Sequence, residues 1–115
     1  MEGEKGQTGG GRLARLKHMK NPRILHLNLH REFFDLIERG LKKTEYRECT
    51  PYWRKRLEGR DYDVIRFRNG YATKAPIMDV QYVAKGFRVV GSKKEYAIRL
   101  GKILKIKNYK RSKTR

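Results

Sequence analysis

A long stretch of alternating apolar and polar residues constrains the fold of this chain more than any other feature. It follows Pro76, runs through Ile77–Val90 and turns at residues 91 to 94, after which the alternation resumes over residues 96 to 100. Alternation with a period of two on both sides of a turn predicts a β-hairpin, and Gly86 indicates a bulge or bend within it. A long antiparallel hairpin of this kind argues against a doubly wound α/β fold.

Two earlier segments have the same alternating character. Leu25, Leu27 and Leu29 share one face of a first predicted strand, with polar residues and Ile24 on the other. A second strand, with Ile65 and Phe67 facing inward, runs into the turn signal Asn69-Gly70. We expect both strands to contribute one face to the core.

A short helix is predicted between these strands. It begins near Arg31 and spans about ten residues, with Phe33, Ile37 and Leu41 on one stripe that should face the core. Gly40 is expected to end it, because glycine adopts the left-handed conformation that commonly follows a helix.

A second short helix is predicted after residue 50. Thr50 supplies an N-cap and Pro51 suits the first helical position. Trp53 and Leu57 are four residues apart and are expected to pack inward.

These elements predict an α+β fold, a small β-barrel of five or six strands with two short helices. The patterned region covers residues 23 to 106, which suits one domain. Residues 1 to 22 form a Gly-rich basic extension, and residues 107 to 115 carry Lys or Arg at most positions. We expect both terminal segments to be disordered.

The composition points to an anionic partner. Lys and Arg number 30 against 12 Asp and Glu, and the resulting net charge of +18 favours a polyanionic partner. Nucleic acid is favoured over a membrane surface because the basic tail lacks the apolar face of an interfacial helix. No apolar run approaches the roughly 20 residues of a membrane span, and the first residues contain no apolar stretch of the kind expected in a signal peptide. With one cysteine, Cys49, no internal disulfide can form. We therefore expect a cytoplasmic protein that does not bind membranes.

The sequence shows no cofactor motif and no metal site. His26 and His30 are four residues apart, which along a strand is about 13 Å and too far for both to ligate one metal. No cofactor or metal is therefore predicted.

Charged residues gather where the first helix should give way to a strand. The sequence Gly40-Leu41-Lys42-Lys43-Thr44-Glu45-Tyr46-Arg47 alternates after its glycine, so Glu45 and Arg47 share one face while Thr44 and Tyr46 share the other. Lys42 lies in the turn and can lean toward either face. We refer to Lys42, Glu45 and Arg47 as the corner cluster.

The spacing Gly-x-Lys-x-x-Glu-x-Arg at such a corner resembles the signature of the ASCH domain, a small RNA-binding type of β-barrel in the PUA-like superfamily. Residues 25 to 56 and 63 to 71 are similar to the small ASCH proteins that phages and prophages often carry, and the resemblance covers roughly residues 23 to 106. It implies a PUA-like barrel and a nucleic-acid ligand.

The corner cluster has three interpretations. Its charges could form surface ion pairs that contribute little. They could instead line a ligand cleft, in which Lys42 and Arg47 hold a phosphate or base edge and Glu45 orients them. The third interpretation is catalysis by Lys42 and Glu45, as in a ribonuclease that needs an acid and a base near the phosphate.

The resemblance also extends to acetylcytidine amidohydrolases, whose sites combine a Lys, a Thr three residues later and a downstream Glu. Lys42 occupies the Lys position, but Glu45 stands where the Thr would be, and Thr44 should face away. Only Glu95 follows in the downstream segment. This departure disfavours amidohydrolase chemistry.

Our prediction is therefore a nucleic-acid-binding protein that prefers RNA or single strands. The alternative is an enzyme that acts on RNA or on a modified nucleoside. Beyond the corner cluster, aromatic residues that could stack on bases and cations that could hold phosphates complete the predicted interface: Tyr46, Tyr52, Tyr71, Arg54, Lys55 and Arg56.

Overall fold

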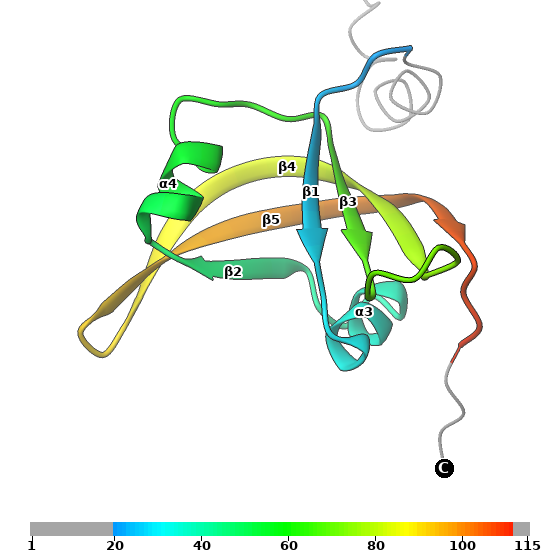
Figure 1. The fold of residues 1–115 in the computed structure, drawn as a ribbon. Helices are drawn as coiled ribbons and strands as arrows, with labels where there is room; N and C mark the ends of the chain where they lie inside the picture. The colour runs from blue at the N-terminus through cyan, green and yellow to red at the C-terminus, as the bar shows by residue number, and fades with distance from the viewer. Residues whose placement is uncertain (1–19, 112–115) are drawn as a thin grey trace, which may run out of the picture.

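The computed structural model describes residues 20 to 111. Over this range the elements follow in the order β1 (Ile24–Asn28), α3 (Arg31–Glu38), β2 (Thr44–Glu48), α4 (Pro51–Leu57), β3 (Val64–Arg68), β4 (Ile77–Val90) and β5 (Lys93–Lys107). The strands form one five-stranded mixed sheet in the order β1-β3-β4-β5-β2 (Figure 1). The described chain is thus a small α+β domain with two short helices, as the sequence pattern predicts.

The β4–β5 hairpin is the centre of the sheet. It arches across the molecule in Figure 1, with β3 antiparallel to β4 on one side and β2 antiparallel to β5 on the other. β1 pairs in parallel with β3, placing Leu25 opposite Ile65. β1 and β2 are therefore the two edge strands, and the connection from β1 to β3 carries α3, β2 and α4.

The irregular part of the hairpin lies upstream of the predicted position. The register between β4 and β5 shifts between Asp79 and Ala84, whereas Gly86 pairs with Ala97 in regular register. The prediction of a bulge at Gly86 is therefore wrong. The glycine that the irregular region requires is Gly101 on β5, where a Cβ atom would lie 2.3 Å from Oε1 of the Gln81 side chain.

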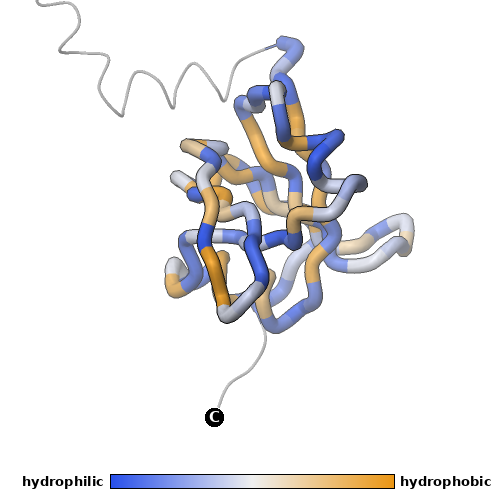
Figure 2. The backbone as a smooth tube through the Cα atoms, turned by 90° about the vertical axis from the view of Figure 1, so that its left-hand side faces the viewer, coloured by the Kyte–Doolittle hydropathy of each residue, from blue (hydrophilic) through white to orange (hydrophobic). Residues whose placement is uncertain are grey.

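The core is built by apolar side chains from β1, β3, β4, β5 and both helices. Figure 2 shows hydrophobic and hydrophilic residues alternating along the chain. The predicted faces of the two earlier strands are confirmed, because the residues that define them are buried: Leu25, Leu27, Leu29, Ile65 and Phe67. In the alternating segment on β5, Tyr96, Ile98 and Leu100 are buried as well. Each face follows directly from period-two alternation.

The predicted face of the first helix is wrong in two of its three residues. Phe34 and Ile37 are the buried residues of α3, while Phe33 and Leu41 are exposed. Leu41 cannot continue a helical stripe because α3 ends at Glu38. Gly40 does end the helix as predicted, with φ of +78° and its N–H donating to Ile37 O at 3.0 Å.

The second helix begins as the sequence predicts. The Thr50 hydroxyl oxygen accepts a hydrogen bond from the Trp53 backbone N–H at 3.3 Å, and Pro51 occupies the first turn. Leu57 is fully buried and Trp53 is half-buried against the core. Capping and packing together fix α4 beside β2.

The segment after β5 is docked, which corrects the prediction of a solvated tail as far as Arg111. The Tyr109 ring packs 5.2 Å from that of Phe34, and its hydroxyl donates to Asp35 at 2.7 Å. Arg111 donates to both carboxylate oxygens of Glu38 at 3.0 and 2.8 Å. These contacts hold the segment against α3. The predictions for residues 1–19 and 112–115 lie outside the described residues.

Docking of Tyr109 makes stability sensitive to alkaline pH. Burial and the hydrogen bond to Asp35 raise the pKa of Tyr109 to about 12, from an ordinary value of about 10. Because the pKa of Tyr109 is higher in the folded state, its contribution to the free energy of unfolding is fully present below about pH 10. That contribution is lost as the pH rises through about 12. The difference in phenolate absorbance between the parent and Tyr109→Phe should therefore titrate near pH 12. A difference centred on about pH 10 would contradict the docking.

Candidate nucleic-acid interface

Glu45 is the one buried charged residue in the described part of the chain, with 5% of its surface exposed. The Lys42 Nζ atom lies 3.2 Å from its Oε1 atom. The Arg47 guanidinium donates to its Oε2 atom through Nε at 2.8 Å and approaches it through Nη2 at 2.6 Å. A carboxylate removed from water requires such partners. The corner cluster therefore forms as predicted, with a cation on each carboxylate oxygen.

Strand alternation and a tight turn bring the three side chains together. Glu45 and Arg47 are two residues apart on β2 and pair with Ile98 and Tyr96 on β5, so they point toward the buried side of the sheet. Lys42 reaches them from the turn that follows α3, and its ammonium group also donates to the Thr44 carbonyl at 2.7 Å. The lysine is therefore held at two points.

Arg47 also connects parts of the structure that share no backbone pairing. Its Nη2 atom donates to the carbonyl of Asn28, the last residue of β1, at 3.1 Å. Its guanidinium carbon lies 5.0 Å from the centre of the Trp53 ring on α4. Side chains thus bridge the two edge strands and the second helix. With Lys42 and Arg47 side chains 18% and 20% exposed, the cluster is not a set of surface ion pairs.

A groove of about 430 Å³ opens beside Lys42. It lies between the turn after α3 and the irregular part of the hairpin. We call it the corner groove, and its lining residues are Ile37, Gly40, Lys42, Lys43, Gln81, Leu100, Gly101, Lys102 and Ile103. Three lysines thus surround a surface to which three apolar side chains contribute.

The cations of the corner groove are available to a ligand. Lys43 and Lys102 are exposed and form no ion pair with any residue in the described range. Lys42 has three N–H donors, of which Thr44 and Glu45 take two. The arrangement suits a ligand that combines an anionic group with an apolar or planar part. Glu45 and Arg47 do not line the groove. Glu45 holds Lys42 at its edge, and Arg47 holds Glu45.

Tyr46 points to the opposite side of β2 from Glu45 and Arg47, as the alternation predicts, and the Lys42 Nζ atom lies 5.6 Å from the centre of its ring. Together with Thr44 it lines a second groove, of about 440 Å³. The Arg88 guanidinium carbon lies 3.4 Å from the centre of the Tyr46 ring. That face of the ring is therefore already covered by a cation.

The other predicted interface residues lie apart from the corner groove. On α4, Arg54 and Lys55 are exposed, and the Arg56 guanidinium covers the Tyr52 ring at 3.5 Å. Tyr71 is 87% exposed in the loop between β3 and β4. None of these residues lines the groove. Sequence reasoning also missed Gln81 and Lys102, and the irregular pairing around Gly101 that presents them left no pattern in the sequence.

The described residues contain no group of three or more His, Cys, Asp or Glu side chains placed to hold a metal ion. Among those same residues, every helix is too short or too polar to cross a bilayer. Comparison of the chain with models of protein families, with curated proteins and with solved structures gives no match. A function for this protein must therefore be inferred from its own residues.

Proposed function

We propose that this protein is a PUA-like ASCH barrel that binds single-stranded nucleic acid, RNA in preference, in the corner groove. The observation that carries the proposal is the set of three lysines around the groove, one of them fixed by the buried carboxylate of Glu45. A net charge of +18 supports a polyanionic ligand. The resemblance of the corner to the ASCH signature points the same way.

The shape of the groove favours an unpaired strand over a duplex. Ile37, Leu100 and Ile103 offer apolar surface among the lysines, and an unpaired nucleotide can place its base or sugar there while its phosphate meets the ammonium groups. In a duplex the bases are stacked inside and only the phosphates would reach the protein. The lysines alone would then provide affinity without discrimination.

The alternative, an enzyme acting on RNA or a modified nucleoside, requires Lys42 and Glu45 to meet the substrate. Glu45 is enclosed by its two cations and does not line the groove. Thr44 lines the second groove, on the other side of β2 from Glu45, which disfavours it as a nucleophile in the corner groove. These positions favour a binding role for the corner cluster.

Fluorescence anisotropy with short labelled RNA, single-stranded DNA and duplex DNA over a range of salt concentrations tests the proposal. Lys102→Ala is the sharpest variant, because Lys102 is exposed and makes no ion pair within the described structure. We expect it to weaken RNA binding by about fivefold at about 0.1 M salt and to reduce the salt slope by about 0.7, the loss of one phosphate contact. Lys42→Ala should weaken binding at least as much.

Lys93→Ala is the matched control. Lys93 is also an exposed lysine, but it lies at the tip of the hairpin and pairs with Glu48. Equal losses for the control and for Lys102→Ala would mean that only net charge matters, and the corner groove would be rejected. If no polymer binds at about 0.1 M salt, the nucleic-acid proposal fails. In that case, turnover of a modified nucleoside by the parent protein that is lost in Lys42→Ala would support the alternative function as an enzyme.

A further inference from the structure

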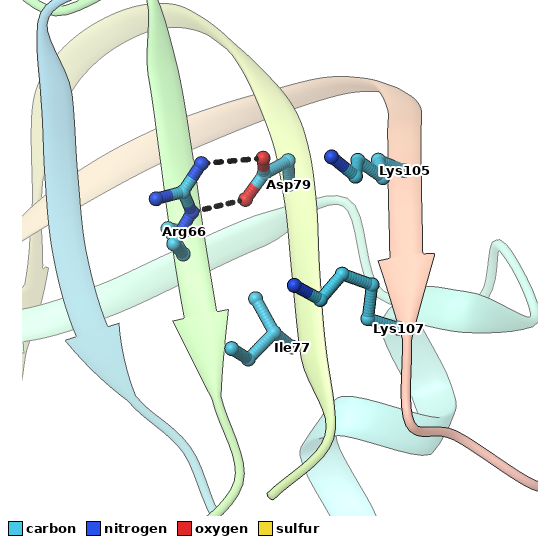
Figure 3. A pocket seen from close by; sticks show the side chains of 5 residues that line it. All are labelled: Arg66, Ile77, Asp79, Lys105 and Lys107. Atoms are coloured by element: carbon cyan, nitrogen blue, oxygen red, sulfur yellow. Dashed lines mark hydrogen bonds and ion pairs between the residues drawn. The ribbon is translucent and has the colours of Figure 1, made fainter. Parts of the chain in front are cut away.

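A second cluster of cations lies on the open face of the sheet and shares no lining residue with the corner groove. Five residues surround a depression of about 110 Å³, and we call it the sheet-face site: Arg66, Ile77, Asp79, Lys105 and Lys107. Figure 3 shows these side chains projecting from β3, β4 and β5. No residue of either helix lines it, so it is a feature of the sheet alone.

The pairing of the strands creates this site. Arg66 lies opposite Asp79, and Asp79 lies opposite Lys105, so one row crosses three strands. Ile77 and Lys107 are opposite each other in the next row on the same face. The residues between them along the strands point the other way, and Phe67 and Met78 are fully buried there. The site therefore backs onto the core and is presented by a rigid surface.

The charges within the site are unequally satisfied. Arg66 donates to both oxygens of Asp79, through Nε at 2.7 Å and through Nη2 at 2.9 Å, which makes a neutral pair. Lys105 and Lys107 are exposed and have no ion-pair partner in the described part of the chain. In Figure 3 both amino groups extend toward β4, the strand on which Asp79 and Ile77 lie. The site has a net charge of +2.

We propose that the sheet-face site binds a phosphate group of the nucleic-acid strand, as a second contact separate from the corner groove. Lys105 and Lys107 stand about 7 Å apart along one face of β5, a distance at which both can reach a phosphate between them. The depression holds several times the roughly 30 Å³ that one water occupies in the liquid, so a phosphate fits. Arg66 neutralises the charge of Asp79, which borders the site. This inference rests on the proposed function for the source of the phosphate.

The test compares variants that remove charge at the site, keep it, or remove it elsewhere. Lys105→Gln/Lys107→Gln should weaken binding of a short labelled oligouridylate on the order of tenfold at about 0.1 M salt and lower the salt slope by about 1.4. Lys105→Arg/Lys107→Arg should retain affinity. Lys93→Gln/Lys94→Gln removes two charges at the far end of the same hairpin and should cost less. A loss as large in this control as in the site variant would overturn the proposal.

Asp79→Asn is expected to change the binding affinity in the opposite direction. It removes the only negative charge of the site and frees part of Arg66, so we expect tighter binding of the oligouridylate. Unchanged or weaker binding with the fold intact, as judged by circular dichroism, would count against the site.

A titration with inorganic tripolyphosphate separates this inference from the proposed function. Backbone amide shifts in nuclear magnetic resonance should move at Ile77, Asp79, Lys105 and Lys107, and not in the Lys105→Gln/Lys107→Gln variant. If the protein binds no oligonucleotide but shows these shifts, the proposed function fails and the phosphate site stands. If tripolyphosphate leaves these amides unmoved, the sheet-face site is rejected even where RNA binds in the corner groove.

Discussion

Glu45→Ala is expected to lower the free energy of unfolding by about 3 kcal/mol. The substitution leaves Lys42 and Arg47 without the carboxylate that both of them contact. It also loosens the guanidinium that links β2 to the end of β1. Because the two cations are each about one-fifth exposed, water compensates in part, and the loss should fall at the low end of the range for buried ion pairs. Urea unfolding followed by Trp53 fluorescence and circular dichroism measures it.

Glu95→Ala serves as the control. Glu95 also pairs with an arginine, Arg88, at 2.8 Å, but their side chains are 21% and 44% exposed. Its loss should cost less than about 1 kcal/mol. If the two variants unfold at the same urea concentration, the corner cluster contributes no more to stability than an exposed ion pair does.

Phe34→Ala should destabilise the protein by about 3 to 5 kcal/mol. Phe34 is fully buried in the core, and its ring also packs against Tyr109 from the docked C-terminal segment. Its truncation therefore leaves a cavity between α3 and the sheet and removes the platform for that segment. The same urea experiment measures the loss.

The adjacent residue provides a matched comparison. Phe33 is on the same helix and 37% exposed, so Phe33→Ala should cost about 1 kcal/mol or less. The two variants lose the same atoms and differ only in the direction of the side chain. If Phe33→Ala lowered the free energy of unfolding more than Phe34→Ala, the result would support the sequence-based prediction that Phe33 faces the core.

The strand faces could be predicted from the sequence because alternation is a local property. Leu25 and Leu27 are buried for the same reason as Ile65 and Phe67. Helix α3 is different, since an eight-residue helix with neighbouring apolar residues at 33, 34, 36 and 37 has more than one acceptable stripe. Packing against the sheet selects Phe34 over Phe33, and this choice depends on partners from distant strands.

The same distinction applies to the candidate site. Lys42, Glu45 and Arg47 are close in sequence, so turn and strand geometry alone predicted that they could meet. The far wall of the corner groove comes from Gln81 and Lys102, which the hairpin delivers from a distant part of the chain. The hydrogen bond from Tyr109 to Asp35 spans 74 residues and has no local signal at all.

The order of strands in the sheet has a consequence for synthesis of the protein. β2 pairs with β5, whose residues follow it by roughly fifty positions, and β1 pairs with β3, about forty positions later. At roughly 5 to 20 residues per second, β2 would wait about 3 to 10 seconds on the ribosome for its partner. Before then its peptide groups can be satisfied only by water. β2 can therefore join the sheet only after β5 has been made, whereas β1, β3 and β4 find partners among strands made before β5.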